Sequence, residues 1–185
     1  MRIIGGTARG RMLKTPTGQD VRPTSDKVRL AIFNALFSRG GVVDKNIMDV
    51  FCGTGALGCE ALSHGAAHCH FFDISKTSLS LAKENVALLG FSDRADFFLK
   101  DAKTLGVCPV GGVQADVVFL DPPYRKELVH PTLDALRKGA WIKQGAIAVI
   151  ETEKECDPPS GFGPVIFDKL YGETRVIFIE VMPHG

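Results

Sequence analysis

The run Ile47-Met48-Asp49-Val50-Phe51-Cys52-Gly53-Thr54-Gly55-Ala56-Leu57-Gly58 decides the fold of this 185-residue chain. Its first part, Ile47–Phe51, is a short apolar segment that predicts a strand, and the pattern over Ala56–His64 predicts a helix. The glycines between these elements permit a tight turn, and the amides at the helix start can face polar groups of a ligand. This order of elements indicates an α/β domain that binds a ligand at the turn, although glycines after a strand are often only a turn.

Strands and helices continue to alternate beyond this run, as in α/β proteins. The last two strands are joined only by Tyr171-Gly172-Glu173-Thr174, which is too short for a crossover, so they are expected to pair antiparallel. We therefore predict a seven-stranded sheet with six parallel strands and one antiparallel strand. The six further strands are His68–Phe72, Arg94–Leu99, Val117–Leu120, Ala146–Ile150, Val165–Leu170 and Val176–Val181, and the further helices are Lys76–Leu89, a short turn after Asp101, and Glu127–Lys138.

The first part of the chain is strongly basic. Residues 1–39 hold eight basic and two acidic side chains, a local balance of +6 in a chain whose net charge is +1. Two short extended pieces, Arg2–Ile4 and Met12–Lys14, flank a turn rich in glycine and arginine, which predicts a hairpin or arm. Such a cluster favours docking to a polyanion, because phosphate contacts release counterions. A solvated basic face is the alternative.

An amphipathic helix is predicted between this arm and the first strand. Apolar residues recur at three-to-four spacing over Val28–Leu36, and the pattern ends near Gly40-Gly41. Thr24 or Ser25 is placed to cap the start of the helix. Thr24 and Ser25 can also form the floor of a ligand site, but the pattern favours the cap.

The composition fits one soluble domain. The chain is 45% hydrophobic and contains no apolar run long enough for a membrane span and no secretory leader at its start, so we expect a cytoplasmic protein. Its five cysteines are an odd number without a CxxC pair, which argues against a disulfide framework and a zinc ribbon. His68 and His70 share one face of a strand, but no third ligand follows nearby, so no metal is expected.

Carboxylates at the ends of two predicted strands indicate an adenosine pocket. Asp73 lies about twenty residues beyond the glycines, where a carboxylate can accept hydrogen bonds from both ribose hydroxyls. Asp101 is placed to accept from an adenine amino group. Because Gly58 completes a GxGxxG spacing, a nicotinamide-dependent enzyme is the alternative, but it leaves the motif after the fourth strand unexplained. The candidate cofactor-binding residues are Asp49, Gly53, Gly55, Asp73, Asp101 and Ala102.

That motif is Asp121-Pro122-Pro123-Tyr124, directly after the buried run Val117–Leu120. An exocyclic amine of a base is a poor nucleophile, because its lone pair is delocalised into the ring. An oxygen of Asp121 and the carbonyl of Pro122 can accept hydrogen bonds from the two N–H groups of the amine, and the stiff backbone fixes both acceptors. Tyr124 can stack on the base. Beside an adenosine pocket, the motif predicts methylation of a base amine by S-adenosylmethionine. A strand ended by prolines, with a capping aspartate, is the alternative interpretation.

The chain resembles the bacterial 16S rRNA guanine-N2 methyltransferases over nearly its whole length. Its most discriminating part is Arg22-Pro23-Thr24-Ser25-Asp26-Lys27-Val28-Arg29, since other amino-methylating enzymes share the glycine loop and the Asp-Pro-Pro-Tyr motif. The resemblance is carried by Arg2-Ile3-Ile4-Gly5-Gly6, Arg9-Gly10-Arg11, the segment 22–29, Asp49–Gly58, Asp121–Tyr124 and Tyr171-Gly172-Glu173-Thr174. Two positions depart from the family pattern. Cys52 stands where a small, alanine-like residue is usual, and Asp73 stands where glutamate is commoner, but aspartate retains the carboxylate.

The resemblance implies a Rossmann-like class I S-adenosylmethionine-dependent methyltransferase fold. It implies methyl transfer without a metal to the N2 amino group of a guanine in 16S rRNA, within an assembled or assembling small ribosomal subunit. We expect a monomeric, single methyltransferase domain over 1–185, with an RNA-docking extension over 1–40 and a catalytic core over 45–183. The expected catalytic residues are Asp121, Pro122 and Tyr124, and the expected RNA contacts are Arg2, Arg9, Arg11, Arg22, Pro123 and Arg125.

Two other functions compete with this one. A DNA adenine-N6 methyltransferase uses the same motif chemistry, but 185 residues leave no room for a separate target-recognition domain. A non-catalytic RNA-binding module with a decayed cofactor pocket is the second, and the intact Gly53, Gly55, Asp73 and Asp121 argue against decay.

Overall fold

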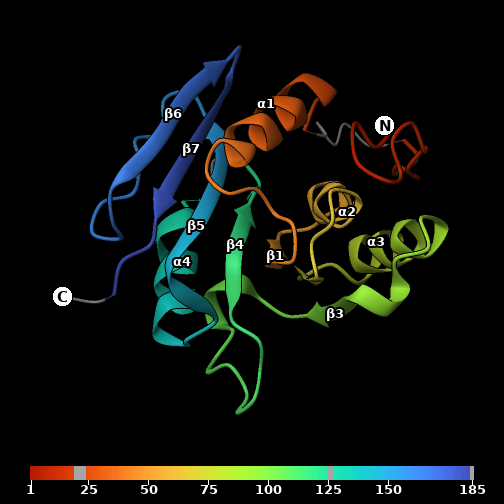
Figure 1. Ribbon diagram of the computed structural model, residues 1–185. Coiled ribbons are helices and arrows are strands. Elements are labelled where there is room, and N and C mark those ends of the chain that lie inside the picture. The colour runs from red at the N-terminus through yellow and green to blue at the C-terminus, as the bar shows by residue number, and fades with distance from the viewer. Residues whose placement is uncertain (19–23, 125–126, 184–185) are drawn as a thin grey trace.

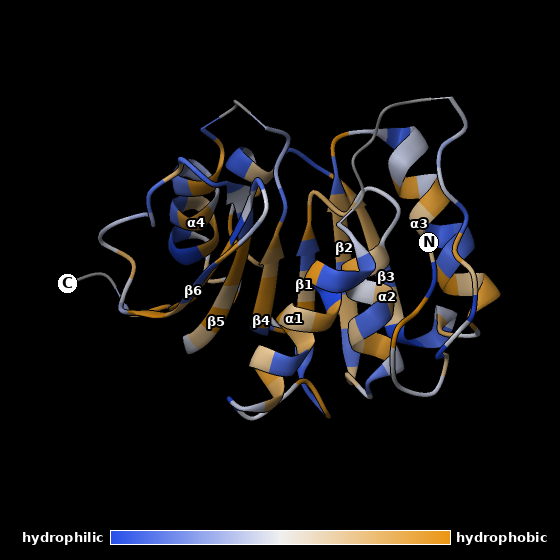
Figure 2. Cartoon of the chain, turned by 90° about the horizontal axis from the view of Figure 1, so that it is seen from above, coloured by the Kyte–Doolittle hydropathy of each residue, from blue (hydrophilic) through white to orange (hydrophobic). Residues whose placement is uncertain are grey.

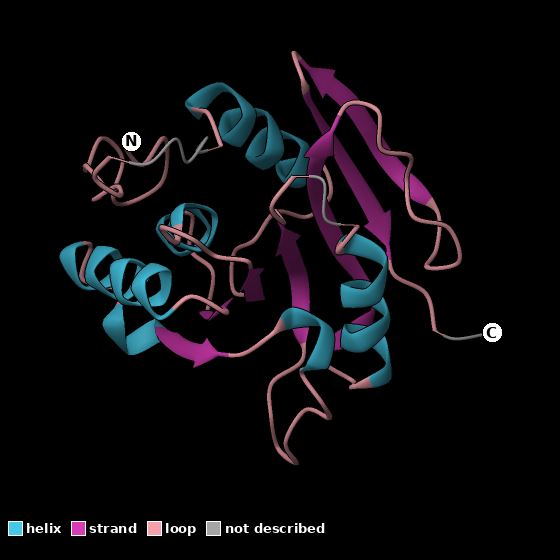
Figure 3. Ribbon diagram, turned by 180° about the vertical axis from the view of Figure 1, so that it is seen from behind, coloured by secondary structure: helices cyan, strands magenta, loops and turns pink. Residues whose placement is uncertain are grey.

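The computed structural model describes residues 1–18, 24–124 and 127–183 as a three-layer α/β structure (Figure 1). One face of the central sheet is covered by α1 (Asp26–Phe37), α2 (Ala56–Ser63) and α3 (Lys76–Leu88). The other face is covered by α4 (Val129–Lys138) together with the short 3-10 helix η2 (Ala102–Thr104), as the view from behind shows (Figure 3). A second 3-10 helix, η1 (Ser92–Arg94), precedes the third strand.

The sheet has the predicted seven strands in the order β3-β2-β1-β4-β5-β7-β6. Every neighbouring pair is parallel except those of β7, which runs antiparallel to both β5 and β6. The prediction of six parallel strands and one antiparallel strand is therefore confirmed. The strands are β1 (Asn46–Val50), β2 (His68–Asp73), β3 (Ala95–Leu99), β4 (Ala115–Leu120), β5 (Ile142–Glu153), β6 (Val165–Tyr171) and β7 (Thr174–Glu180).

Several predicted boundaries were wrong, and local chemistry explains most of them. Helix α1 ends at Phe37, not near Gly40, because the chain turns at Ser38 and the Gly41 amide donates to the Leu36 carbonyl at 2.8 Å. Helix α4 begins at Val129, not at Glu127, so that Pro131 falls in the first turn, where a missing N–H costs nothing. Strand β5 continues beyond Ile150 to Glu153, where it still pairs with β7.

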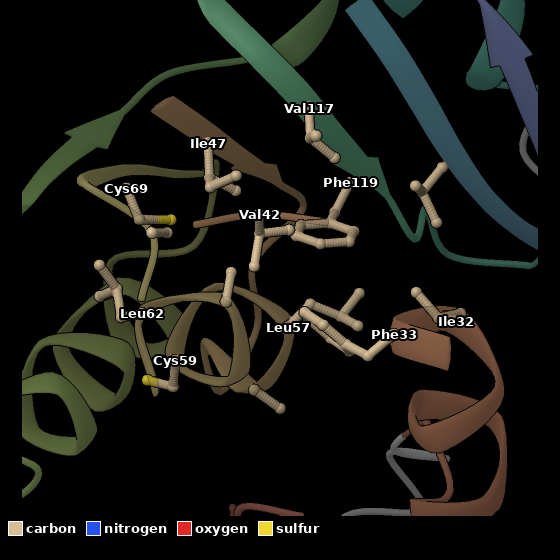
Figure 4. Packing of buried hydrophobic residues seen from close by; sticks show 14 of the residues in the cluster. Ile32, Phe33, Val42, Ile47, Leu57, Cys59, Leu62, Cys69, Val117 and Phe119 are labelled. Atoms are coloured by element: carbon tan, nitrogen blue, oxygen red, sulfur yellow. The ribbon is translucent and has the colours of Figure 1, made fainter. Parts of the chain in front are cut away.

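Two apolar clusters, one on each face of the sheet, form the core. Because side chains alternate along a strand, Val117 and Phe119 face α1 and α2, while Val118 and Leu120 face α4. Phe119 packs against Phe33 of α1, with ring centroids 5.8 Å apart (Figure 4). The central strands are the most hydrophobic part of the molecule (Figure 2). Among the described residues, none of the helices combines the length and apolarity that a bilayer crossing requires.

The basic N-terminal arm forms the predicted turn and is held against α2 and α3. Arg2 and Met12 form an antiparallel bridge. The buried Glu60 carboxylate of α2 accepts from the amides of Ile4, at 3.0 Å, and Gly5, at 2.8 Å. Asn85 of α3 accepts from the Lys14 amide at 2.7 Å and donates to the Lys14 carbonyl at 3.0 Å. Buried side chains of α2 and α3 therefore form hydrogen bonds with the backbone of the arm.

Gly58 sets how closely α2 approaches the sheet. A Cβ atom at this position would lie 2.3 Å from the Phe71 ring and 2.8 Å from the Cys69 sulfur. Both neighbours are fully buried on β2, so neither can move away freely. The third glycine of the loop therefore serves helix packing, not ligand contact.

We expect Gly58→Ala to lower the free energy of unfolding by about 1–3 kcal/mol, because the added methyl group overpacks a rigid contact. Chemical denaturation measures this change. Adding Phe71→Leu to Gly58→Ala should restore space, so the double variant should be more stable than the sum of the single changes predicts. A fully stable Gly58→Ala protein would contradict the packing described.

Candidate active site

Several of the predicted site residues, among them Asp49, Asp73 and Asp121, lie at the carboxyl ends of β1, β2 and β4. The strand order reverses between β1 and β4, since the chain crosses from the β3 edge back to the middle of the sheet. Open α/β sheets bind ligands in the crevice at such a point. Here the turn Asp121–Tyr124 stands between two cavities and contributes to the walls of both.

The glycine-loop cavity, about 520 Å³ in volume, lies between the β1–α2 loop, the end of β2 and the motif. Three of the predicted cofactor residues, Asp49, Gly53 and Asp73, line it. The Gly53 amide donates to Asp73 Oδ2 at 3.0 Å, and the Ser75 amide donates to Asp73 Oδ1 at 2.8 Å. The Asp73 carboxylate is thus held in place at the rim, and each oxygen keeps a lone pair for a ligand hydroxyl.

Asp49 is fully buried beneath this loop. Its Oδ2 accepts from the Gly58 amide at 2.9 Å and so joins β1 to the first turn of α2. Burial raises the pKa of Asp49 to about 8, and the negative charge of Asp73 adds to the rise. Asp49 therefore retains its proton over much of the neutral range.

The other predicted cofactor residues do not line the cavity. Gly55 adopts the left-handed conformation, with φ of 77°, and its ideal Cβ position lies 3.0 Å from the Ala82 Cβ, so it shapes the turn. Asp101 begins η2 by accepting from the Lys103 amide at 2.9 Å, and Ala102 is buried behind it. Adenine binding by Asp101 and Ala102 stays a prediction.

Ile74 lines the glycine-loop cavity, but the sequence interpretation missed it. It follows Asp73 directly and is 72% exposed. An exposed isoleucine at a cavity rim can pack on a flat ring. Its position immediately after the strand-ending aspartate was the available signal.

Thr24 links the motif to a carboxyl group that the sequence interpretation also missed. The Thr24 hydroxyl lies 3.2 Å from Asp121 Oδ2 and 2.6 Å from Glu151 Oε2. Burial raises the pKa of Asp121 well above its usual value, and the charge of Glu151 adds to this. The helix cap is Ser25, whose side chain accepts from the Val28 amide. Thr24 is therefore part of the site floor and not the cap.

The second cavity, which we call the β4–β5 cavity, lies on the other side of the motif and is about 680 Å³ in volume. Pro122, Pro123 and Tyr124 form the wall that it shares with the glycine-loop cavity. Its remaining lining comes from α4, the end of β5 and the loop that follows β5. The polar residues that line it are Glu127, His130, Thr152, Glu153, Glu155 and Asp157, so hydrogen-bond acceptors predominate among the described residues.

Three of the predicted RNA contacts lie on or beside the N-terminal arm. Arg9 is exposed. Arg2 forms an ion pair with Asp26 at 3.4 Å, and Arg11 donates to the Leu88 carbonyl at 2.6 Å. Met1 lines the glycine-loop cavity, so the arm begins at its rim. Pro123 is exposed on the shared wall, whereas Arg22 and Arg125 lie outside the described residues.

Cys52, which lines the glycine-loop cavity, and the two histidines of β2 also bear on the sequence predictions. Cys52 is buried, and burial raises the pKa of its thiol, which fits an inert loop residue. Asp96 of β3 lies opposite His70 in the sheet register, and its Oδ2 is 2.8 Å from His68 Nε2 and 3.5 Å from His70 Nε2. Sheet pairing thus supplies the third polar group that is missing from the local sequence. The absence of a metal stays a prediction.

Known proteins are similar to this chain over most of its length. A family model described as conserved hypothetical protein 95 matches residues 1–180. Ribosomal RNA small subunit methyltransferase D of Escherichia coli K12 is 33% identical over 160 residues, which are 86% of this chain and 78% of that protein. The protein of the same name from Haemophilus influenzae is 34% identical over 156 residues, 84% of this chain and 80% of its own length.

Solved structures confirm the predicted class I methyltransferase fold. The yhhF protein of Escherichia coli, provisionally described as a methyltransferase, has a TM-score of 0.84 and 30% identity, covering 100% of this chain and 99% of that one. An RNA methyltransferase of Salinibacter ruber in complex with S-adenosyl-L-homocysteine has a TM-score of 0.67 and 18% identity, covering 88% of this chain and 95% of that one. The second similarity concerns the fold alone.

The raised pKa of Asp49 predicts how the free energy of unfolding depends on pH. Its pKa is about 8 in the folded protein and about 3.9 in an unfolded chain, so between these values the folded state binds the extra proton. The free energy of unfolding must then fall as pH rises, by at most about 1.4 kcal/mol per pH unit from this group. Asp49→Asn removes this contribution.

Chemical denaturation of the wild type and Asp49→Asn from pH 5 to pH 8 measures the difference. The variant should lose less stability over this range than the wild type. Asp93→Asn, at an exposed position, is the control and should follow the wild-type slope. Parallel curves for the wild type and Asp49→Asn would show that Asp49 titrates normally.

Proposed function

We propose that this chain, which belongs to the family of ribosomal RNA small subunit methyltransferase D, transfers a methyl group from S-adenosylmethionine to the N2 amino group of a guanine in 16S rRNA. The observation that carries the proposal is the position of Asp121–Tyr124 between two cavities. One cavity suits the methyl donor, the other suits the acceptor base, and the motif can contact both reacting groups.

The charge and shape of the glycine-loop cavity support S-adenosylmethionine as its ligand. Among the described residues that line it, the side chains with carboxyl groups are Asp49, Asp73 and Asp121, and no lysine or arginine side chain is present. Carboxyl oxygens can accept hydrogen bonds from the ammonium group of the donor. Asp73 can accept from the ribose hydroxyls, and Ile74 can pack on the adenine ring. A volume of about 520 Å³ lies within the usual range for small-molecule sites.

The motif accounts for the chemistry without a covalent enzyme intermediate or a metal. When bound, the donor supplies a methyl group on a positively charged sulfur. Asp121 and the Pro122 carbonyl accept the two N–H groups of the amine and orient its lone pair toward that methyl group. The nitrogen–carbon bond forms as the carbon–sulfur bond breaks, and the nitrogen then loses a proton to solvent in the β4–β5 cavity. Tyr124 holds the base by stacking.

The lining of the β4–β5 cavity favours guanine over adenine. Guanine presents two adjacent donors, N1–H and the N2 amino group, whereas the amine of adenine adjoins an unprotonated ring nitrogen that needs a donor. Thr152, Glu153 and Glu155 offer oxygen acceptors next to the shared wall. These acceptors match the two adjacent donors of guanine and support guanine over the DNA adenine-N6 alternative.

The basic arm supports a structured RNA as substrate. Arg9 is exposed on an arm that begins at the rim of the glycine-loop cavity. Arg11 and Arg2 extend the basic surface along the same arm. Phosphate contacts there would position the RNA while the cavity reads the base. We propose that a monomer acts in the cytoplasm on 16S rRNA within an assembled or assembling small ribosomal subunit.

Asp121→Ala should bind S-adenosylhomocysteine with near wild-type affinity in calorimetry, because Asp73 and the glycine loop are unchanged. Its rate of methyl transfer to unmodified small subunits should fall by a factor of about 10²–10³, since one preorganised acceptor is lost. Asp93→Ala is a control away from both cavities. Mass spectrometry of digested nucleosides should find N2-methylguanosine in the wild-type reaction. An N6-methyladenine product, or a near-normal Asp121→Ala rate, would overturn the proposal.

Replacing Arg9 and Arg11 with alanine should weaken binding to the subunit and reduce its salt dependence. Each lost phosphate contact should lower the slope of log affinity against log salt by about 0.7–0.9. Filter binding over a series of salt concentrations measures this slope. Lys138→Ala with Lys169→Ala removes two exposed charges on α4 and β6 and should leave the slope unchanged. An equal effect of both double variants would exclude a specific docking role for the arm.

A further inference from the structure

Thr24 occupies an unusual position between two acidic side chains. Its hydroxyl lies 3.2 Å from Asp121 Oδ2 and 2.6 Å from Glu151 Oε2, and both Thr24 and Glu151 are buried. The three residues come from the segment before α1, the end of β4 and strand β5. The proposed function assigns no role to Thr24.

The number of available protons limits which hydrogen bonds Thr24, Asp121 and Glu151 can form with one another. A hydroxyl carries one proton, so Thr24 can donate to only one of the two carboxyl groups. Both contacts are hydrogen bonds only if one carboxyl holds a proton and donates to Thr24. A length of 2.6 Å is typical of a hydroxyl donating to an ionised carboxylate, about 2.5–2.7 Å. The longer contact to Asp121 does not fit this class, so the two lengths favour Glu151 as the ionised partner.

The surrounding charges favour the same distribution of the proton. Asp121 faces Glu151 from β5, which repels a negative charge on it, and Asp49 from β1 adds to this repulsion only where it is ionised. Glu151 interacts favourably with the buried guanidinium of Arg29 from α1. Burial and the charge of Glu151 raise the pKa of Asp121 well above its usual value. The nearby cation thus stabilises the charge on Glu151, and the negative charge of Glu151 favours a neutral Asp121.

We propose that Thr24 and Glu151 are positioning residues that hold Asp121 as a neutral acid in the active site. Asp121 Oδ2–H donates to Thr24 Oγ1, the Thr24 hydroxyl donates to Glu151 Oε2, and Asp121 Oδ1 remains to accept from the base amine. This inference rests on the proposed methyl transfer. A neutral acid presents its carbonyl oxygen as an amide does, and the hydrogen-bond chain keeps that oxygen in one orientation.

The hydroxyl is tested by Thr24→Val, which keeps the shape of the side chain and removes the hydrogen bonds. We expect kcat to fall about tenfold or more, with KM for the subunit and affinity for S-adenosylhomocysteine changed little, because an oriented acceptor is lost from the transition state. Thr24→Ser restores the hydroxyl and should recover most of kcat. Thr132→Val is the matched control, since Thr132 is also buried but its hydroxyl has no partner in the described structure.

The charge is tested by Glu151→Gln, which keeps an acceptor for Thr24 and removes the negative charge. Without that charge Asp121 should ionise more readily, so the limb of the kcat–pH profile that reports Asp121 should move to lower pH. Asp121→Asn should lose that limb. An isotope-edited infrared difference spectrum between the wild type and Asp121→Asn, at neutral pH, should show the carbonyl band of a neutral carboxylic acid.

These measurements separate this inference from the proposed function. A wild type that methylates no nucleoside refutes the proposed function, whereas the infrared band still reports the state of Asp121. A wild-type kcat in Thr24→Val, a Thr24→Ser protein as slow as Thr24→Val, or the absence of the acid band would each overturn the inference. If melting curves show that Thr24→Val does not fold, the pH profile of Glu151→Gln decides.

Discussion

The pairing of β1 with β4 is the constraint on which the site depends. Chain direction along the sheet reverses at this pair, so no crossover helix fills the space at its carboxyl end. The glycine loop leaves β1 and the Asp121–Tyr124 turn leaves β4 into that space. The register from Ile47 opposite Val117 to Val50 opposite Leu120 brings the two loops out side by side. The two cavities follow from this adjacency.

Buried carboxyl groups surround the same point, which is costly for a folded protein. Asp49 is joined to the Gly58 amide, and Asp121 and Glu151 meet at Thr24. Such groups reduce stability unless they are hydrogen-bonded, neutral or paired with a cation. These carboxyl groups lie together where a sulfonium donor is proposed to bind. Groups that reduce stability in this way are typical of functional sites.

The first 40 residues serve the site in two ways that composition does not separate. The arm is held against α2 and α3 by Glu60 and Asn85, which pair its backbone and leave exposed basic side chains on the surface. The segment before α1 instead reaches beneath the motif through Thr24. This stretch, which the sequence presents as one basic extension, therefore supplies both a candidate RNA surface and part of the floor of the candidate site.

The sequence by itself determined the seven strands, the antiparallel hairpin, the glycine loop and the Asp-Pro-Pro-Tyr turn, because periodicity and turn chemistry act between residues close in the chain. Only the tertiary structure decided that Thr24 meets Glu151, that Asp96 joins His68 and His70, and that Asp101 lies outside the cavity lining. These contacts join elements far apart in the chain, and they depend on sheet order and register, which no local pattern encodes.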